Sequence, residues 1–276
     1  VLPDWAGPFR EEVIRGIEAA RRDLKHRDAK IRVCVCESDV PAETIELLDE
    51  LCSWGAQGIA LCALDDVMIE AKVNELAERG IPCITFNSDL PASRRLCFVG
   101  QDYAKSGRIA AELLSKCIPV NAKVLAMAGN LEYNGHRTRL DGFCAHLREK
   151  GFFAEQIEVV ETYNDYRVTY NKVTEALQSI PGLRAIYMAN RSVTGCVDAV
   201  KAAGMAGKIR VIAHDMSPRR RQMLREGSLD LTITQDLYRQ GYQPLLLLCD
   251  LLQKQQQRDA DQLSTNISII CAENLD

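Results

Sequence analysis

The chain has 276 residues, of which 47% are hydrophobic and 26% charged, a composition typical of a soluble globular protein. This length fits two lobes of about 100–150 residues each better than one core. The net charge of -4 argues against nucleic-acid binding by this chain itself, and no apolar run approaches the ~20 residues that a membrane helix requires.

The chain carries 11 cysteines, which are scattered through apolar stretches. An exported protein with so many free thiols would risk mispairing, whereas a reducing cytosol keeps them as small hydrophobes. The sequence therefore predicts a cytoplasmic protein. No metal site is expected, because no CxxC motif and no cysteine–histidine cluster occurs, and Cys34 and Cys36 lack a second pair of ligands.

Short β-rich apolar runs alternate with amphipathic helical patterns along the chain. Residues Val13, Ile17, Ala20 and Leu24 repeat at helical spacing, and a second helix is expected to begin at Pro41. Five glycines stand where a left-handed helix C-terminus is wanted, namely Gly55, Gly80, Gly151, Gly204 and Gly227. The predicted strands occupy residues 31–36, 58–64, 81–86, 97–100, 123–128, 157–162, 185–189, 210–214, 231–234 and 267–271.

Several of these strands are apolar at successive positions, as expected for parallel strands that are buried on both faces. The alternation of strands and helices predicts an α/β protein with doubly wound parallel sheets. Such a sheet opens with a strand, yet only residues 1–2 precede the turn at 3–8 and the first helix. We therefore expect the first strand to begin upstream of this sequence.

The common catalytic and nucleotide-binding signatures are missing. The sequence contains no GxGxxG, Walker A, GxSxG or HExxH motif, so no cofactor and no enzymatic activity are expected. The His214-Asp215 dipeptide is better explained as a strand-end loop than as a metal or catalytic site. The Arg219-Arg220-Arg221 run follows a helix-start signal at Ser217-Pro218 and indicates a solvated face in preference to an anion site.

Polar residues recur where predicted strands end. They are Asn87-Ser88-Asp89, Gln101-Asp102, Asn190-Arg191, His214-Asp215 and Gln235-Asp236. In doubly wound sheets the carboxyl ends of the strands converge on the ligand, and amides, carboxylates and guanidinium groups can satisfy sugar hydroxyls. Trp5 and Phe9 could form an apolar platform for a sugar ring. Turn chemistry explains each Asn or Asp singly about as well, but their recurrence favours binding.

A series of motifs carries a resemblance to a known family. In chain order they are PFREEVIRGIEAA, GAQGIALCALD, FVGQDYAKSGRIAAELL, RTRLDGF, AIYMANRSVTGCVDAVKAAG, RVIAHD, LTITQDLYRQGYQPL and ENL. The chain resembles a type I periplasmic-binding-protein domain, and specifically the effector-binding part of a LacI-family (lactose-repressor-like) transcriptional regulator. The resemblance covers essentially the whole chain after the first strand.

This resemblance implies a sugar or polyol ligand and names residues for it. Asn87, with Ser88 or Asp89, matches a ligand-contacting strand end, and Phe9 matches an aromatic residue that packs on the ring. Four further matches are Arg139, Asn190, Asp215 and Gln235. Arg191 stands where the family often has Asp, His214 where it often has Phe, and Asn87 where ribose-binding relatives have Asp. The first two differences make the crevice more basic and extend the expected ligands to an acidic sugar or a phosphosugar.

The resemblance also implies two lobes joined by a three-stranded hinge. The crossings are expected near residues 101–103, 235–237 and 263–266. One lobe would then comprise residues 1–102 with 236–263, and the other 103–235 with 264–276. A ligand in the interlobe cleft would shift an open-to-closed equilibrium. A homodimer would pass that change to an upstream helix-turn-helix, the only part expected to contact DNA.

The cysteines, the missing front end and the closing ENL favour the regulator. The alternative is an extracytoplasmic sugar-binding protein of an ABC transporter or a receptor's sensor domain, which should be monomeric, begin with an intact first strand and tolerate few thiols. An enzyme is the least favoured interpretation, because it would need a nucleophile–base pair or a metal cluster that the strand ends do not offer.

Overall fold

The chain passes three times between two units. The computed structural model describes residues 1–5, 7–131, 133–253 and 262–275. Unit 1 comprises Val1–Gln101 and Asp236–Asn266, and unit 2 comprises Asp102–Gln235 and Ile267–Asp276. The third crossing follows Asn266, and Thr265 still bonds within unit 1. Its N–H donates to Gly100 O at 2.8 Å, and its hydroxyl lies 3.4 Å from Gln240 Nε2.

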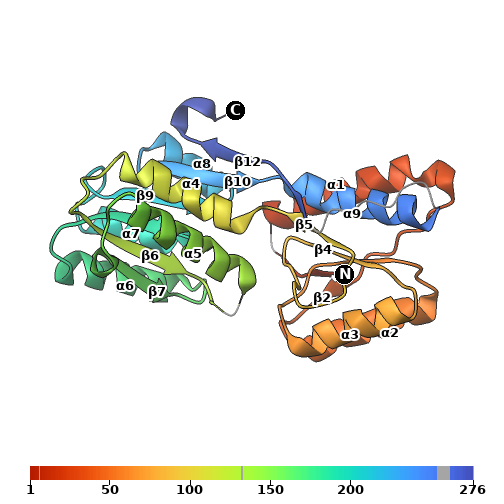
Figure 1. Ribbon diagram of the computed structural model, residues 1–276. Helices are drawn as coiled ribbons and strands as arrows, with labels where there is room; N and C mark the ends of the chain where they lie inside the picture. Colours follow the sequence, from red (N-terminus) through yellow and green to blue (C-terminus); the bar gives the residue numbers. More distant parts are fainter. Residues whose placement is uncertain (6, 132, 254–261, 276) are drawn as a thin grey trace. The chain divides into compact units, whose positions relative to one another are not determined.

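Unit 2 contains a six-stranded sheet covered by helices on both faces (Figure 1). Its strands, in spatial order, are β12 (Ile267–Ile270), β10 (Leu231–Gln235), β9 (Arg210–His214), β8 (Leu183–Met188), β6 (Lys123–Ala128) and β7 (Ile157–Glu161). All pairings are parallel except that of β12 with β10. The helices are α4 (Tyr103–Ser115), α5 (Asn134–Glu149), α6 (Tyr166–Ser179), α7 (Val193–Ala202) and α8 (Pro218–Arg225).

Strand β6 shows why the apolar runs of unit 2 are continuous. Val124 and Ala126 pack into the cluster that contains α4 and α5, whereas Leu125 and Met127 pack into the cluster of α6 and α7 on the other face. Successive side chains of a strand point to opposite faces, so both positions must be apolar when both faces are covered. The predicted doubly wound α/β fold is confirmed.

Unit 1 repeats this arrangement. Its four-stranded parallel sheet has the order β11 (Gln262–Ser264), β5 (Cys97–Gly100), β4 (Cys83–Phe86) and β3 (Ile59–Leu61). A bond from Cys62 N to Val1 O at 3.0 Å links β3 to the parallel pair β1 (Leu2–Pro3) and β2 (Val35–Cys36). The helices are α1 (Pro8–Asp23), α2 (Pro41–Trp54), α3 (Val67–Glu78) and α9 (Leu237–Leu252), and short 3-10 turns cover Lys25–Arg27 in unit 1 and Ala154–Gln156 and Ala272–Asn274 in unit 2.

Two details of the sequence prediction need correction. The strand predicted at 31–36 pairs only at Val35–Cys36, and β11 was not predicted, because its side chains are polar or only half-buried. The glycine prediction is confirmed at all five positions, which have φ between 66° and 93°, with Gly204 and Gly55 at the two ends of that range.

Each unit contains a pair of helices whose backbones touch through one glycine from each helix. In unit 2 a methyl group on Gly107 of α4 would overlap Arg139 O, and one on Gly142 of α5 would overlap Ala104 O. In unit 1 the same relation joins α1 and α9. There a methyl on Gly16 would overlap Tyr238 O and one on Gly241 would overlap Val13 O. Only glycine allows helices to approach this closely, so these residues set the distance between the paired helices.

The two helix pairs share a sequence pattern that the structure reveals. Helices α4 and α9 both follow a crossing between the units, and the sequence there reads Gln-Asp at 101–102 and again at 235–236. Asp102 caps α4 through a 2.8 Å bond from Lys105 N, and Asp236 caps α9 through a 2.9 Å bond from Arg239 N. The glycine that contacts the paired helix, Gly107 or Gly241, comes five residues after the capping aspartate. The repeat therefore places a contact glycine in the second turn of both α4 and α9.

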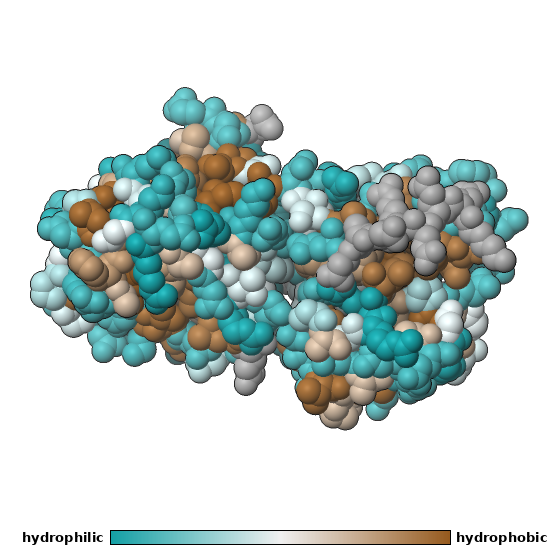
Figure 2. Space-filling model, in the orientation of Figure 1, coloured by the Kyte–Doolittle hydropathy of each residue, from teal (hydrophilic) through white to brown (hydrophobic). Residues whose placement is uncertain are grey.

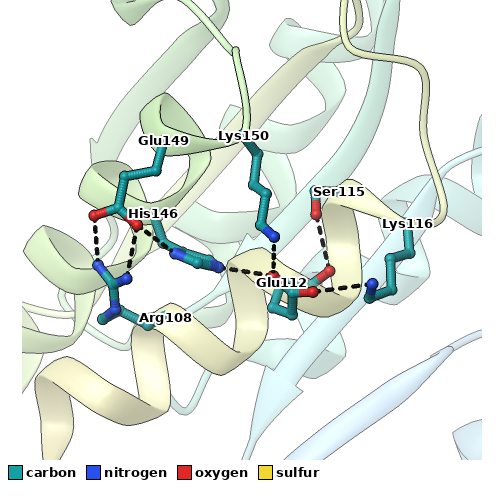
Figure 3. A network of polar contacts seen from close by, with 7 residues as sticks. All are labelled: Arg108, Glu112, Ser115, Lys116, His146, Glu149 and Lys150. Carbon is teal, nitrogen blue, oxygen red and sulfur yellow. Dashed lines mark hydrogen bonds and ion pairs between the residues drawn. The ribbon is translucent and has the colours of Figure 1, made fainter.

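A polar network covers the outer side of the α4–α5 pair (Figure 3). Its members are Arg108, Glu112, Ser115, Lys116, His146, Glu149 and Lys150. His146 joins its halves, with Nδ1 2.8 Å from Glu149 Oε2 and Nε2 2.8 Å from Glu112 Oε2. The pKa of Glu112 is lowered to about 2, chiefly by Lys150, and that of Glu149 to about 2, chiefly by Arg108. Both carboxylates are solvated, so these pairs contribute little to stability.

The face drawn in Figure 2 is largely hydrophilic, with separate apolar areas. One of them lies where Figure 1 draws β10 and β12. Strand β12 is the edge strand of its sheet, and its residue Ile269 is 40% exposed. Within the described parts of the chain, no helix combines the length and the apolar character needed to cross a membrane.

The close α4–α5 contact predicts that Gly107→Ala lowers the free energy of unfolding by about 2 kcal/mol, because the new methyl must push Arg139 O away. Helix propensity alone would favour alanine by about 1 kcal/mol. Urea denaturation measures the difference. Lys105→Ala, on an exposed position of the same helix, is the matched control and should change stability by less than about 0.5 kcal/mol. A stabilised Gly107→Ala variant would contradict the contact.

Candidate ligand-binding site

Asp215 and Gln235 form a linked pair at the carboxyl end of the unit 2 sheet. Asp215 follows β9 and has φ 62°, a conformation that Asp and Asn tolerate better than other residues. Its N–H donates to Ile233 O at 2.9 Å, and its carbonyl accepts from the Thr232 hydroxyl at 2.7 Å. Gln235 Nε2 donates to Asp215 Oδ1 at 2.8 Å. This holds the carboxylate in place and leaves most of its acceptor capacity for a ligand.

Asn190 lies where the strand order of the sheet reverses. It follows β8, which pairs with β6 on one side and β9 on the other, and ligands of doubly wound sheets bind at such a switch point. The side chain is 4% exposed. Its Nδ2 donates to Thr162 Oγ1 after β7, and its Oδ1 accepts from the Ser192 hydroxyl at 3.4 Å. Thr162 after β7 and Ser192 after β8 therefore fix the orientation of this amide.

Arg139 is a buried guanidinium held by the first turn of α4. The residue is 5% exposed, and its Nε lies 3.3 Å from Ser106 Oγ. Its Nη1 donates to Ala189 O at 3.4 Å, next to Asn190. The Tyr103 ring lies 4.9 Å from the guanidinium carbon, a cation–π geometry. Arg139 thus lies beside the residues that follow β8.

His136 belongs to this group, although the sequence analysis treated it only as one of four dispersed histidines. It lies one helical turn before Arg139 on α5, a spacing that could have indicated a shared face. Its Nδ1 is 3.0 Å from Asn130 O, after β6. Burial and, next, the nearby Arg139 charge lower the pKa of His136 to about 4, so the imidazole is neutral at pH 7. It offers hydrogen bonds but no charge.

The expectation that His214 makes the site more basic is wrong. The side chain is 1% exposed, and its Nε2 lies 2.7 Å from the Tyr187 hydroxyl. Burial first, then the charges of Arg139 and Arg220, hold the pKa of His214 far below its ordinary value. The imidazole is therefore neutral, and its Nδ1 is buried without a partner among the described residues.

The run Arg219-Arg220-Arg221 was predicted to form a solvated face, but only part of it is exposed to solvent. Arg219 is exposed and lies 3.9 Å from Asp198, whereas Arg220 is only 8% exposed. The Arg220 Nη2 donates to Arg191 O at 2.9 Å. Arg191 itself is exposed, and its N–H donates to Asn164 Oδ1 at 3.0 Å. A helix turns each successive side chain by 100°, so one of three adjacent residues faces the sheet.

In unit 1, Asn87 occupies the position that Asp215 has in unit 2. It follows β4, has φ 60°, and its N–H donates to Val99 O at 3.2 Å, on the neighbouring strand. Its Nδ2 donates to Gln240 Oε1 at 2.9 Å, and Gln240 is fully buried in the first turn of α9. The unit 1 site residue is therefore also held by the helix that follows a crossing.

Asp89 has an evident structural partner. Arg95 contacts both of its carboxylate oxygens, with Nη2 2.8 Å from Oδ2, and the Thr85 hydroxyl donates to Oδ1 at 2.7 Å. These contacts brace the loop after β4. Trp5 and Phe9 lie together at the start of α1, with ring centroids 4.9 Å apart in an edge-to-face arrangement, and both are half-buried. They present an apolar surface near one end of unit 1.

Unit 2 thus brings Arg139, Asn190, Asp215 and Gln235 to the carboxyl ends of adjoining strands, and unit 1 places its candidates after β1 and β4. A cavity of about 490 Å³ lies elsewhere in unit 1. It adjoins the chain that enters β2 and β3, including residues 28–33 and 54–58, and none of the predicted site residues lines it. The predicted site residues therefore lie outside the cavity, although Gln240, which bonds Asn87, is among the residues that line it.

The model of the periplasmic binding protein domain family matches residues 1–256. The chain belongs to this family. Solved structures agree with the fold, which is the type I periplasmic-binding-protein fold. A solute-binding protein from Burkholderia graminis in complex with D-arabinose superposes with a TM-score of 0.88 at 21% identity, covering 99% of this chain and 94% of that one. A glucose-galactose binding protein from Geobacillus stearothermophilus gives a TM-score of 0.87 at 21% identity, covering 99% and 97%.

Curated relatives within the periplasmic-binding-protein family are sugar-binding proteins. The D-allose-binding periplasmic protein of Escherichia coli is 25% identical over 262 residues, which is 91% of this chain and 82% of that protein. The D-ribose/D-allose-binding protein of Pseudomonas aeruginosa is 24% identical over 243 residues, 85% of this chain and 75% of that protein.

These relatives overturn the LacI-type regulator interpretation, together with its DNA-binding function and cytoplasmic location. The motifs indicate a fold that regulators and periplasmic binding proteins share. They do not distinguish one class of protein from the other. The expected homodimer rested on the same interpretation and gains no support from these relatives.

The cysteine argument for the cytoplasm failed because most of the thiols are protected. Of the 11 cysteines only Cys117 is exposed, while seven are buried: Cys34, Cys36, Cys62, Cys83, Cys97, Cys196 and Cys249. Burial raises the pKa of Cys62 to about 12 and that of Cys83 to about 12. Such thiols are inert toward disulfide exchange in the folded protein, so their number does not decide the compartment.

The neutral histidines predict that the protein becomes less stable in mild acid. His136 has a folded pKa of about 4, below the ~6.5 of an unfolded histidine, so from pH 7.5 to 5.5 only the unfolded chain takes up its proton. The free energy of unfolding should therefore fall by about 1 kcal/mol from His136 alone. Urea denaturation at both pH values tests this, and His136→Gln should reduce the loss. An equal loss in both proteins would contradict a buried neutral His136.

Proposed function

We propose that this chain is an extracytoplasmic sugar-binding protein of a solute-uptake system, and that its ligand is a monosaccharide related to ribose or allose. The observation that carries this proposal is the meeting of a carboxylate, two amides and a guanidinium at the strand ends of unit 2. The names of the curated relatives support the sugar class, and the periplasmic description of the Escherichia coli relative supports the location. Binding without catalysis is proposed on the same grounds.

The side chains of unit 2 suit adjacent hydroxyl groups. Asp215 accepts hydrogen bonds from two hydroxyls while Gln235 holds one of its oxygens, and Asn190 offers both an acceptor and a donor. Arg139 supplies donors from a fixed, buried position. Because each group is already oriented by a neighbour, little side-chain entropy is lost when a sugar binds.

Unit 1, taken by itself, offers a different chemistry for a sugar. The Trp5–Phe9 pair suits the apolar C–H face of a sugar ring, and Asn87 adds an amide that Gln240 orients. We assign Asp89 to bracing the loop that carries Asn87, because Arg95 and Thr85 occupy its oxygens.

A thermal-shift screen against monosaccharides, followed by calorimetry with each sugar that binds, tests the proposal. A cognate sugar at one hundred times its dissociation constant should add about 2.7 kcal/mol of stability. D-ribose and D-allose are the first probes, with pentoses, hexoses, uronic acids and phosphosugars beside them. The absence of a shift with every sugar would contradict the proposed function.

Asp215→Asn should weaken sugar binding by about 10- to 150-fold, because one charge-assisted hydrogen bond contributes about 1.5–3 kcal/mol. Titration calorimetry measures the loss, and circular dichroism checks that the variant is folded. Asp141→Asn, at an exposed position of α5 two residues after Arg139, is the matched control and should keep the wild-type affinity. Equal affinities of the Asp215 variant and the wild type would remove Asp215 from the site.

A further inference from the structure

The guanidinium of Arg220 is buried and makes few hydrogen bonds to the described residues. It lies in the first turn of α8 and is only 8% exposed. Among the described residues, its side chain makes one hydrogen bond, the 2.9 Å contact from Nη2 to Arg191 O. No carboxylate of the described residues lies within 4.0 Å of the guanidinium of Arg220 or of Arg191. The Asp215 charge acts on this guanidinium without a close ion pair, so most of its hydrogen-bonding capacity is unused by the described residues.

Arg220 lies among the proposed ligand-binding residues. It affects the ionisation of His214, and its own pKa, lowered chiefly by burial, responds to the charges of Asp215 and Arg191. Its main-chain partner Arg191 follows Asn190 directly. The two guanidinium groups therefore adjoin the strand ends that carry Asn190 and Asp215.

The charges at these strand ends are predominantly positive. Arg139, Arg191 and Arg220 carry three positive charges, and Asp215, which is bonded to Gln235, carries one negative charge. The histidines at the site add none, because burial and the same arginines keep them neutral at pH 7. An uncharged sugar would leave this excess of positive charge uncompensated.

The remaining Arg220 donors are accessible to a ligand. Among the described residues, the one buried side-chain nitrogen or oxygen without a hydrogen-bond partner is His214 Nδ1. The Arg220 nitrogens that bond nothing in the protein therefore belong to the small part of the residue that reaches the surface. They can meet a ligand without a rearrangement of α8.

We propose that Arg220, together with Arg191, binds a negatively charged substituent of the sugar, so that the ligand is a phosphosugar or a sugar acid. This inference rests on the proposed function and names its ligand class. A guanidinium donates two parallel hydrogen bonds to a phosphate or carboxylate, and a partly desolvated guanidinium gains more from that contact than an exposed one does. Arg220 supplies the buried contact, and the exposed Arg191 adds a second one.

Titration calorimetry of the whole chain with matched sugar pairs tests this inference. The pairs are D-ribose with D-ribose 5-phosphate, D-allose with D-allose 6-phosphate, and D-galactose with D-galacturonate. We expect at least one charged sugar to bind at least tenfold tighter than its neutral parent. The phosphate and uronate pairs separate the two possible sources of the charge.

The variants Arg220→Gln and Arg191→Gln assign the preference to these residues. Each should reduce the ratio of charged-sugar affinity to neutral-sugar affinity at least tenfold. Arg219→Gln, the exposed neighbour in the same helix, is the matched control and should keep the wild-type ratio. If Arg220→Gln fails to fold by circular dichroism, the exposed position of Arg191 keeps the test available.

Three outcomes would overturn the account at different levels. Neutral sugars that bind as tightly as their charged counterparts would overturn the anion inference and leave sugar binding intact. A charged-sugar preference that neither Arg220→Gln nor Arg191→Gln changes would overturn the assignment to these arginines. A failure of every sugar, charged or neutral, would overturn the proposed function itself.

Discussion

The contact between two helix backbones in each unit is the constraint on which the rest of the structure depends. Glycines at 107 and 142 in unit 2, and at 16 and 241 in unit 1, bring carbonyl oxygens of one helix against Cα atoms of the other. In each unit, one of the two helices starts at a crossing of the chain. Its first turn holds a site residue: Ser106 bonds Arg139, and Gln240 bonds Asn87. The residues that set the helix packing, Gly107 and Gly241, are therefore next in sequence to those that hold the candidate site residues, Ser106 and Gln240.

Burial, more than residue type, decides the charge of the site. Two histidines and three arginines would suggest up to five positive charges. The histidines are neutral at pH 7 because they are buried next to arginines, whereas an arginine keeps its proton even when buried. The positive charge of the candidate site therefore comes from its arginines, and the neutral imidazoles beside them offer hydrogen bonds only.

Much of the fold could be predicted from the sequence because its physical signals are local. Strand β6 is apolar at successive positions since helices cover both faces, and Gly55 ends α2 in the left-handed conformation that favours glycine. The places of Asn190 and Asp215 followed from the rule that polar strand ends converge. The burial of Arg220 between two less buried arginines could not be predicted, because it depends on which face α8 turns toward the sheet.

The class of protein could not be predicted from local sequence signals either. Regulators and solute-binding proteins share the sheet order and the polar strand ends, so the motifs fit both. The cysteine count favoured the wrong compartment, since a thiol such as Cys196 is enclosed by the core and does not take part in exchange. Similarly, Asp89 matched a ligand motif, but the pairing of its carboxylate with Arg95 depends on a loop that sequence spacing does not define.

The most direct test of the central claim is a crystal structure of the chain with the sugar that binds most tightly. The account predicts a sugar hydroxyl within hydrogen-bond distance of the Asp215 carboxylate and of the Asn190 amide, with Arg139 as a further donor. A sugar bound instead in the 490 Å³ cavity of unit 1, with none of these three residues in contact, would contradict it.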